Sequence, residues 1–232
     1  MTEPREDLHL LGARRGVEQG AAMRARHDVV TLAVQDEERG SQLLDAPHAG
    51  SKPLGTKVEI EGASQPGTLV YSSWRTMQEV GETDENACEF NDFALVKIHP
   101  DDLDEVNPTI PFFGGPTGMT DSTQTGETVH SYGNSSLRLG ADALKPKEGK
   151  SLGQGGDGWT HDVYTATPGI PGDSGSAFID ADGKAFGVLS TVQLAPKAGS
   201  NGVSDLSYSE SKTSFDVTLA EGSEPFRGGL LP

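Results

Sequence analysis

From residue 52 onward, the chain contains short runs that either alternate between hydrophobic and polar positions or are rich in β-branched residues, a pattern that predicts β-strands. Gly, Pro, Asn and Asp, which favour turns, separate these runs. The runs occupy residues 56–62, 67–71, 92–98, 127–133, 161–167, 175–180 and 184–192. Between the last two, "DADGK" predicts a hairpin turn, because Asp-Gly readily adopts the positive φ angles that such turns need. The pattern therefore predicts an all-β barrel or sandwich.

Two stretches do not fit the strand pattern. Residues 151–161, "SLGQGGDGWTH", are rich in glycine and lack the lysine of a phosphate-binding loop, so we expect a flexible surface loop. Near the N-terminus, the run from Leu8 to Arg26 predicts a weak helix that several glycines interrupt, and residues 29–34 predict a strand.

The first 50 residues differ in composition from the rest. Six of the nine arginines lie in the first 39 residues, the first lysine is Lys52, and the first of the 14 aromatic residues is Tyr71. A segment with no aromatic ring has little from which to build a core. We therefore expect residues 1–50 to be an atypical, disordered segment and residues 51–232 to be the folded domain.

Composition and charge narrow the classes of function. The 30 glycines and the 34% hydrophobic residues suit short strands and tight turns. A net charge of −17 disfavours nucleic acid and anionic membranes as partners. The N-terminus lacks the basic-then-apolar pattern of a secretory signal. Cys88 is the single cysteine and has no internal partner, and the scattered histidines predict neither a metal nor a cofactor.

Two motifs carry candidate chemistry. In "PGDSGS", residues 171–176, Ser174 lies between glycines, and a serine nucleophile needs both a base and donors for the oxyanion. Gly172 permits close approach of the backbone, so we expect the amides of Gly172 and Ser174 to form an oxyanion hole. In "NDFALVKI", Asp92 comes directly before an apolar strand, which suits a buried acid that orients a histidine.

Together these motifs, "NDFALVKI" and, 82 residues later, "GDSGSAF", resemble the chymotrypsin-like serine peptidases, especially the secreted actinobacterial ones. The likeness covers residues 52–232. It implies two β-barrels, the remainder of the first over residues 51–120 and the second over 121–232. It also implies that His, Asp and Ser meet in that chain order at the interface between the barrels.

The same resemblance assigns roles to individual residues. It implies that Ser174 is the nucleophile, Asp92 the orienting acid, and Gly172 with Ser174 the source of the oxyanion amides. The region of Ser190 in "GVLSTV" is expected to bind the substrate backbone. Pro168 takes the place at the base of the family's specificity pocket, where no acid stands, so we expect a small or apolar side chain next to the cut bond rather than Arg or Lys.

The histidine is the part of the triad that the sequence leaves open, because the family's usual Thr-Ala-Ala-His-Cys motif is missing. Three histidines follow Asp92 and so break the family's chain order; we expect these to be ordinary strand or surface residues: His99, His130 and His161. His48 precedes Asp92 by 44 residues, as in the family, and is the first choice for the base. His27 and then His9 rank below it.

Three functions follow from these observations. The first is a serine endopeptidase that hydrolyses peptide bonds of a peptide or protein substrate. The second is a peptidase-like fold that lacks a working base and binds peptides or proteins. The third is a truncated or mispredicted gene product that does not fold. Replacement of residues 1–50 through fusion, an alternative start, a frameshift or a gene-model error would leave the first barrel incomplete. The resemblance implies an extracellular location, whereas this N-terminus carries no export signal.

Overall fold

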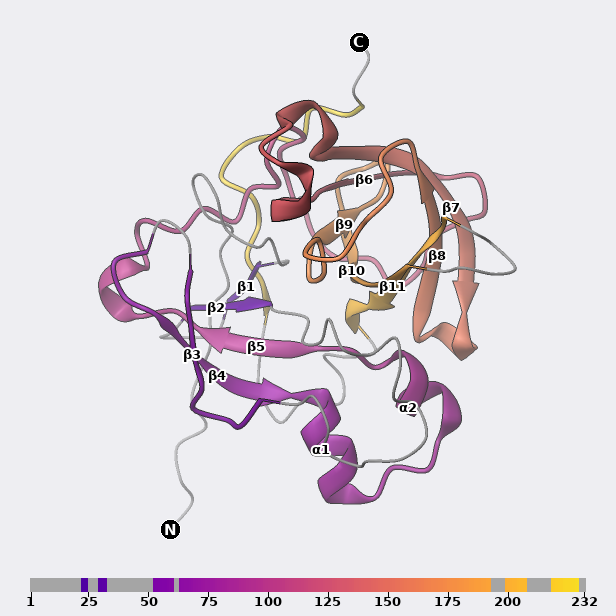
Figure 1. The fold of residues 1–232 in the computed structure, drawn as a ribbon. Helices are drawn as coiled ribbons and strands as arrows, with labels where there is room; N and C mark the ends of the chain where they lie inside the picture. The colour runs from indigo at the N-terminus through magenta and orange to yellow at the C-terminus, as the bar shows by residue number, and fades with distance from the viewer. Residues whose placement is uncertain are drawn as a thin grey trace.

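The computed structural model describes residues 22–24, 29–32, 52–60, 63–192, 199–207 and 218–229. In these residues β-strands predominate, and Figure 1 shows them in two groups. The strands of residues 22–97, joined by one from the C-terminal end of the chain, form an open sheet. The strands of residues 128–205 form a closed barrel. The expectation of an all-β fold is confirmed, and so is the expectation that the fold contains an antiparallel barrel.

The open sheet has six antiparallel strands in the order β12-β1-β2-β5-β4-β3. Their bounds are β1 Ala22–Arg24, β2 Val29–Leu32, β3 Lys57–Val58, β4 Gly67–Ser72, β5 Ala94–Lys97 and β12 Thr218–Leu219. β12 pairs with β1, so the C-terminal part of the chain contributes an edge strand to this N-terminal sheet. Within the described strands, no pairing joins β3 to β12 and closes the sheet.

The barrel also has six antiparallel strands, and these close in the order β10-β11-β8-β7-β6-β9. Their bounds are β6 Thr128–Tyr132, β7 Pro146–Gly155, β8 Thr160–Thr165, β9 Ala177–Ile179, β10 Ala185–Val192 and β11 Asn201–Asp205. A closed barrel leaves no unpaired strand edge, which makes it a rigid support for the loops between its strands.

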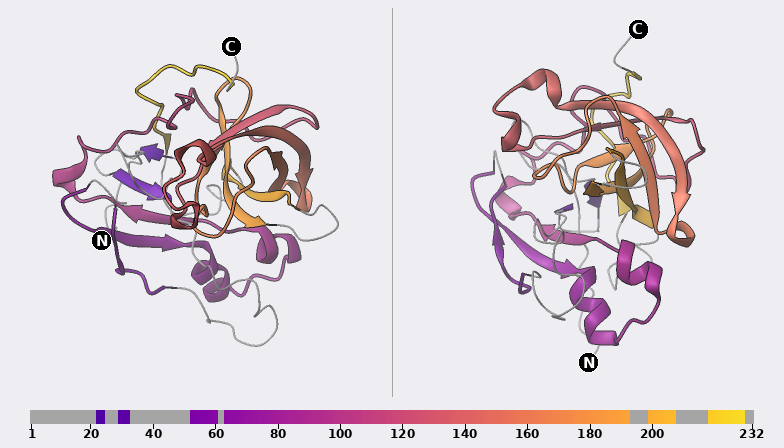
Figure 2. Two further views of the ribbon diagram at one scale, coloured as in Figure 1. Left: turned by 45° about the horizontal axis from the view of Figure 1, so that its top comes forward. Right: turned by 45° about the vertical axis from the view of Figure 1, so that its right-hand side comes forward.

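Two short helices, α1 Ser73–Val80 and α2 Glu85–Phe90, connect β4 to β5. Sequence analysis missed both of them. Asp84 caps α2 by accepting a hydrogen bond from the amide of Ala87 at 2.7 Å, and Gly81 ends α1 in the left-handed conformation. Figure 2 shows both helices beyond the same end of the sheet. No helix in the described part of the chain has the length and apolar character to cross a bilayer.

One hydrophobic core joins the sheet to the barrel. It brings together buried residues of both, among them Tyr71 and Leu95 from the sheet and Ile179 and Val188 from the barrel. A second cluster, which includes Val163, Phe178 and Phe186, fills the inside of the barrel. Because the first core is shared, loops from the sheet and from the barrel are held in fixed positions relative to each other.

The predicted runs match strands β3, β4, β5, β6, β8, β9 and β10. The "DADGK" turn is also confirmed: the amide of Asp180 donates to the carbonyl of Lys184 at 2.9 Å, and Gly183 has a φ of 80°. The strand expected over residues 29–34 corresponds to β2, Val29–Leu32. The helix expected up to Arg26 is wrong at its end, because residues 22–24 form β1, which pairs with strands on both sides.

The flexible loop predicted for residues 151–161 is also wrong. Residues 151–155 belong to β7 and residues 160–161 to β8, and β7 pairs with β6 on one edge and β8 on the other. Backbone hydrogen bonds on both edges hold the strand, although its glycines give it no hydrophobic pattern. Gly149 shows the benefit of a missing side chain, because a Cβ there would overlap the carbonyl oxygen of Tyr164 on β8.

Substitution of Gly149 tests this close approach. Gly149→Ala should lower the free energy of unfolding by about 2 kcal/mol or more, because the methyl group forces β7 away from β8. Gly155→Ala is the matched control in the same strand, since its Cβ would lie 3.5 Å from Thr160 Cγ2 in ordinary contact. Urea unfolding of both variants checks this, and equal losses in the two would contradict it.

Candidate functional site

The turn before β9 presents Ser174 at the surface of the molecule, where the residue is half-buried. Three amides of this turn donate within the protein: Asp173 to Ile170 O, Gly175 to Leu189 O and Ser176 to Asp173 O, at 2.9, 2.8 and 3.1 Å. In the described part of the chain, the amides of Gly172 and Ser174 have no acceptor. Two neighbouring donors of this kind are what an oxyanion hole requires.

Gly172 must be glycine for two reasons. Its φ of 87° lies in the left-handed region, and a Cβ at this position would come within 2.9 Å of Ser135 Oγ. The Ser135 hydroxyl also donates to Pro171 O at 2.6 Å and so holds the preceding residue. The local conformation that leaves the Gly172 and Ser174 amides available is thus specified by sequence and by packing.

The carboxylate of Asp173 is completely buried and forms a charged cluster with Arg138 and Lys147. Arg138 donates to it through Nη2, and Lys147 Nζ donates at 2.9 Å. Two amides complete the cluster, those of Ser135 at 2.9 Å and Ile170 at 3.2 Å. The Lys147 side chain is itself fully buried. Every one of these bonds constrains the turn that carries Ser174.

The cluster determines the protonation of its members. Burial raises the pKa of Asp173, but hydrogen bonds from Arg138 and Lys147 outweigh burial and hold that pKa below its usual value. Burial lowers the pKa of Lys147, and Asp173 opposes the shift only in part. Asp173 is therefore an ionised carboxylate, and its two cationic partners compensate for its loss of hydration.

Asp92 lies in a buried position just before β5. Its Oδ2 accepts a hydrogen bond from the hydroxyl of Ser190 at 2.7 Å. Its amide faces the hydroxyl of Ser204 at 3.3 Å, and this hydroxyl donates to Phe90 O at 2.8 Å. Two serines of the barrel therefore hold an aspartate of the sheet.

These contacts bring Asp92 and the Ser174 turn to the same place in the fold. Leu189 and Ser190 are consecutive residues of β10; the Leu189 carbonyl accepts from the Gly175 amide, and the Ser190 hydroxyl donates to Asp92. Two residues that are 82 positions apart in the sequence are thus connected through a two-residue stretch of one strand. The Ser190 hydroxyl therefore contacts the acid, and the expectation that the region of Ser190 binds the substrate backbone stays a prediction.

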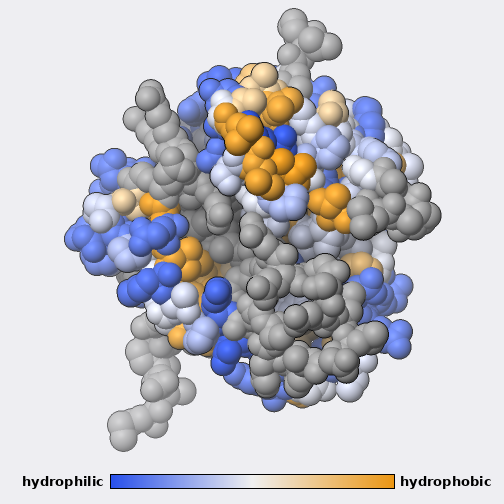
Figure 3. Space-filling view, viewed as in Figure 1, coloured by the Kyte–Doolittle hydropathy of each residue, from blue (hydrophilic) through white to orange (hydrophobic). Residues whose placement is uncertain are grey.

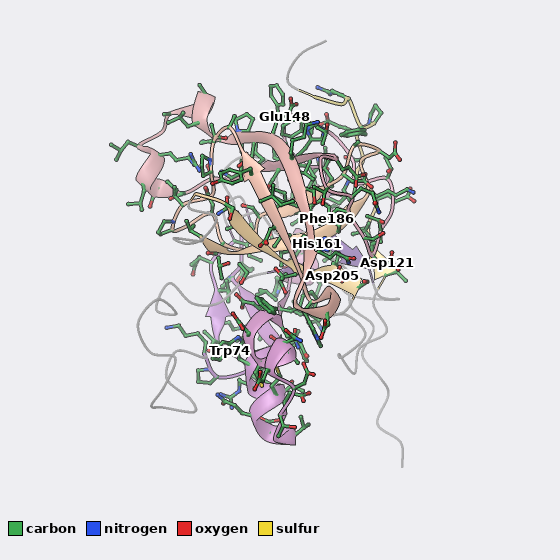
Figure 4. The ribbon with its side chains drawn as sticks, turned by 90° about the vertical axis from the view of Figure 1, so that its right-hand side faces the viewer. Trp74, Asp121, Glu148, His161, Phe186 and Asp205 are labelled. Atoms are coloured by element: carbon green, nitrogen blue, oxygen red, sulfur yellow. The ribbon has the colours of Figure 1, made fainter. Side chains whose placement is uncertain are left out.

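The described histidines all have other partners. His161 Nε2 lies 2.7 Å from Asp205 Oδ2 and its Nδ1 lies 2.9 Å from Thr123 Oγ1, with the ring fully buried in the barrel. Figure 4 shows His161 beside Asp205 and Phe186. His99 accepts from the Asp101 amide through Nδ1 at 3.3 Å. These contacts agree with the expectation of ordinary strand and surface histidines.

His130 is buried against the aromatic rings of Phe113 and Phe226, with ring centroids 4.8 and 5.6 Å away. Burial lowers its pKa, and the nearby Glu148 carboxylate opposes this shift only in part. None of the three described histidines contacts Ser174 or Asp92. The three candidates for the base, His48, His27 and His9, lie outside the described residues.

Pro168 is exposed, and its carbonyl accepts a hydrogen bond from Arg138 Nη2 at 2.9 Å. Beside it, residues 137–144 expose three leucines: Leu137, Leu139 and Leu144. Figure 3 shows hydrophobic atoms gathered over this part of the surface. The acids of residues 101–105 form no site; Asp102 is buried and accepts from the amides of Ser64 and Gln65 at 2.7 and 3.0 Å.

Sequence reasoning missed the cations of the cluster and the side chain of Asn201, which bonds to the segment before Ser174. Arg138 ends a short 3-10 helix and Lys147 is the second residue of β7. No spacing rule links them to Asp173, because the hydrogen bonds span 35 and 26 residues. Asn201 had no sequence signal.

In comparisons with known protein families and with curated proteins, no match to the chain was found. The described residues contain no group of three or more His, Cys, Asp or Glu side chains placed to hold a metal ion. Among the described residues, Asp92, Ser190 and the turn of Gly172 and Ser174 bring a carboxylate, two hydroxyl groups and two backbone amides into one part of the fold.

The buried cluster gives a measurable pH dependence. Asp173→Asn should destabilise the protein by about 3–5 kcal/mol at neutral pH, because two buried cations lose their counterion. The folded pKa of Asp173 lies below the unfolded value of about 3.9. Its stabilisation is therefore fully present above that pH and is lost as the pH falls through the folded pKa.

Urea unfolding between about pH 2 and pH 7 checks both parts of this prediction. Asp182→Asn, at an exposed aspartate of the β9–β10 turn, is the control and should change stability by less than about 0.5 kcal/mol. A loss in Asp173→Asn no larger than in this control would contradict the role of the cluster.

Proposed function

We propose that this protein is a serine endopeptidase of the chymotrypsin-like type, in which Ser174 is the nucleophile and Asp92 the orienting acid. The observation that carries the proposal is the connection of the two residues through β10. Leu189 O accepts from Gly175 N at 2.8 Å, and Ser190 Oγ donates to Asp92 Oδ2 at 2.7 Å. The free amides of Gly172 and Ser174 add the donors that the reaction needs.

The proposed reaction is acyl transfer to serine followed by hydrolysis. A histidine accepts the Ser174 proton as Oγ bonds to the substrate carbonyl carbon, and the amides of Gly172 and Ser174 stabilise the oxyanion. The carbon–nitrogen bond then breaks, and the histidine returns its proton to the leaving amine. Water repeats the sequence on the acyl-enzyme, and Asp92 stabilises the imidazolium in both halves. His48 is the first candidate for this histidine.

The resemblance to the chymotrypsin-like serine peptidases also suggests the architecture, the substrate and the location of the protein. The open sheet and the closed barrel are proposed to be the two halves of a double-barrel peptidase, with the site where they meet. The substrate is a peptide or protein, and the protein acts outside the cell. Supporting evidence is the shared core of sheet and barrel, which holds Asp92 and the Ser174 turn in one rigid frame.

One observation favours a second function, a peptidase-like protein that binds a peptide or protein without cleaving it. His99, His130 and His161 are engaged with other partners, so the described residues supply no base. If none of the histidines in residues 1–50 approaches Ser174, the oxyanion amides and the binding surface remain without a proton acceptor. Only modest rate enhancement would then be left.

Reaction with a fluorophosphonate separates the two functions, because only an activated serine reacts quickly. We expect modification of the folded protein at Ser174, identified by mass spectrometry, and none in Ser174→Ala. Ser176→Ala, at a buried serine two residues further on, is the control and should still react. His48→Ala should abolish most of the reaction. A protein that melts cooperatively but stays unmodified would support the binding function instead.

The role of Asp92 has its own test. Asp92→Asn keeps the size of the side chain but removes the charge that stabilises an imidazolium, so peptide hydrolysis should fall by about 10²–10⁴-fold. Asp101→Asn, an exposed aspartate just after β5, should leave the rate unchanged. Rates are measured on proteins whose melting temperatures are determined in parallel. A rate in Asp92→Asn equal to the control would overturn this assignment.

A further inference from the structure

After β12 the chain leaves the sheet and passes over the barrel as a strap, residues 220–229 (Figure 1). Most residues of the strap are exposed. Backbone hydrogen bonds attach it to residues 107–116: Gly222 N to Pro116 O at 2.7 Å, Gly115 N to Glu224 O at 3.0 Å and Arg227 N to Phe113 O at 2.8 Å. An exposed segment with few buried contacts opens at a lower free energy than the strands of the core.

Phe226 is the strap residue that packs onto the barrel. The centroid of its ring lies 5.6 Å from that of His130 on β6, and the His130 ring lies 4.8 Å from Phe113. The turn between β9 and β10 is also close, because a Cβ on Gly183 would lie 2.7 Å from Phe226 Cγ. Phe226 packs against the core that joins the sheet to the barrel. The strap therefore covers an imidazole and part of this joint.

The covered imidazole can form an ion pair with Glu148. His130 is only 2% exposed, and among the described residues its Nδ1 has no hydrogen-bond partner. Glu148 Oε2 lies 3.5 Å from this nitrogen. The strap lies against the same carboxylate, since a Cβ on Gly229 would overlap Glu148 Oε2. Both members of the pair are thus in contact with the strap.

The surroundings of His130 give a charged ring little compensation. Glu148 and Asp180 favour a proton on the ring, and Lys150 opposes it. Asp180 Oδ1 already accepts hydrogen bonds from two amides of its own turn, both at 2.8 Å. Residues 107–116 carry no charge. Burial outweighs the carboxylates and lowers the pKa of His130. The turn and the strap carry these further charged residues: Asp182, Lys184, Glu221, Glu224 and Arg227.

We propose that His130 is an acid-sensitive switch whose protonation releases the strap of residues 220–229 from the barrel. Under Phe226, an imidazolium loses its hydration, whereas in the open state both water and Glu148 stabilise it. Release withdraws Phe226 from the core shared by the sheet and the barrel, so the joint between them loosens at acidic pH. This inference goes beyond the proposed function and does not depend on a reactive Ser174.

The direction of the pH effect follows from the two states of the strap. In the open state His130 is hydrated, with the ordinary pKa of about 6.5, and in the closed state its pKa is lower. Closure is therefore fully favourable above about pH 6.5. It weakens as the pH falls, by up to about tenfold per pH unit, until the pKa of the closed state is passed. Above about pH 5, Glu221 and Glu224 stay largely ionised and contribute little.

Hydrogen exchange of the full chain, followed by mass spectrometry at about pH 7.5 and about pH 5.5, tests the switch. Each rate is divided by that of an unstructured peptide of the same sequence, which removes the intrinsic effect of pH. Protection of the strap amides of Gly222 and Arg227 should fall at least about threefold at the lower pH. It should also stay at least about tenfold below that of β8 at both pH values, because the strap opens by itself.

Two variants assign the effect to a residue. His130→Phe keeps a ring against Phe226 and removes the titratable group, so strap protection should be equal at the two pH values. His99→Gln is the matched control at an exposed histidine beside Asp101 and should keep the loss at acidic pH. A strap that still loosens in His130→Phe, or that no longer loosens in His99→Gln, overturns the role of His130.

The unmodified chain gives an independent decision if His130→Phe does not fold. In an NMR titration, the His130 ring should titrate with a midpoint below about 6.5, and the strap amides should lose protection over the same pH range. A midpoint at or above that value overturns the proposal. So does a strap whose protection stays constant with pH or equals that of β8. None of these outcomes depends on whether Ser174 reacts with a fluorophosphonate.

Discussion

The buried carboxylate of Asp173 is the constraint on which the candidate site depends. A charge removed from water is tolerated only where partners surround it, and here Arg138, Lys147 and the amides of Ser135 and Ile170 do so. These partners come from three separate segments of the chain. Ser174 directly follows Asp173 in the sequence. The turn that presents the serine therefore cannot change shape without exposing or unpairing a buried charge.

A second set of contacts places the sheet against the barrel at the same site. Asp92 lies just before β5 of the sheet, whereas the hydroxyls of Ser190 and Ser204 that contact it belong to strands β10 and β11. The hydrophobic core shared by the two halves supplies the rigidity, and these polar contacts supply the alignment. Ser174, Asp92 and two amides that have no acceptor among the described residues are thereby brought together, although Ser174 and Asp92 are 82 positions apart in the sequence.

Local pattern accounts for much of the fold. The apolar and β-branched runs in "DFALVKI" and "KAFGVLSTV" predict β5 and β10, and the Asp-Gly of "DADGK" predicts the turn between β9 and β10. The local sequence pattern fails to predict the structure in two places, each for a physical reason. Residues 151–155 have no hydrophobic period, yet their pairing with β8 makes them part of β7. Helices α1 and α2 are too short for a clear period, and tertiary contacts hold them instead.

The sequence by itself determined the all-β class and the turn between β9 and β10, and it indicated Ser174 and Asp92 as candidates, because strand patterns, glycine conformations and side-chain types are local properties. Only the tertiary structure decided that Asp92 and the Ser174 turn meet through β10, that Arg138 and Lys147 neutralise Asp173, and that Asn201 lies between residues 168–171 and β10. These contacts join residues tens of positions apart, and such pairings arise from the closure of the barrel and burial in a common core, which no local pattern encodes.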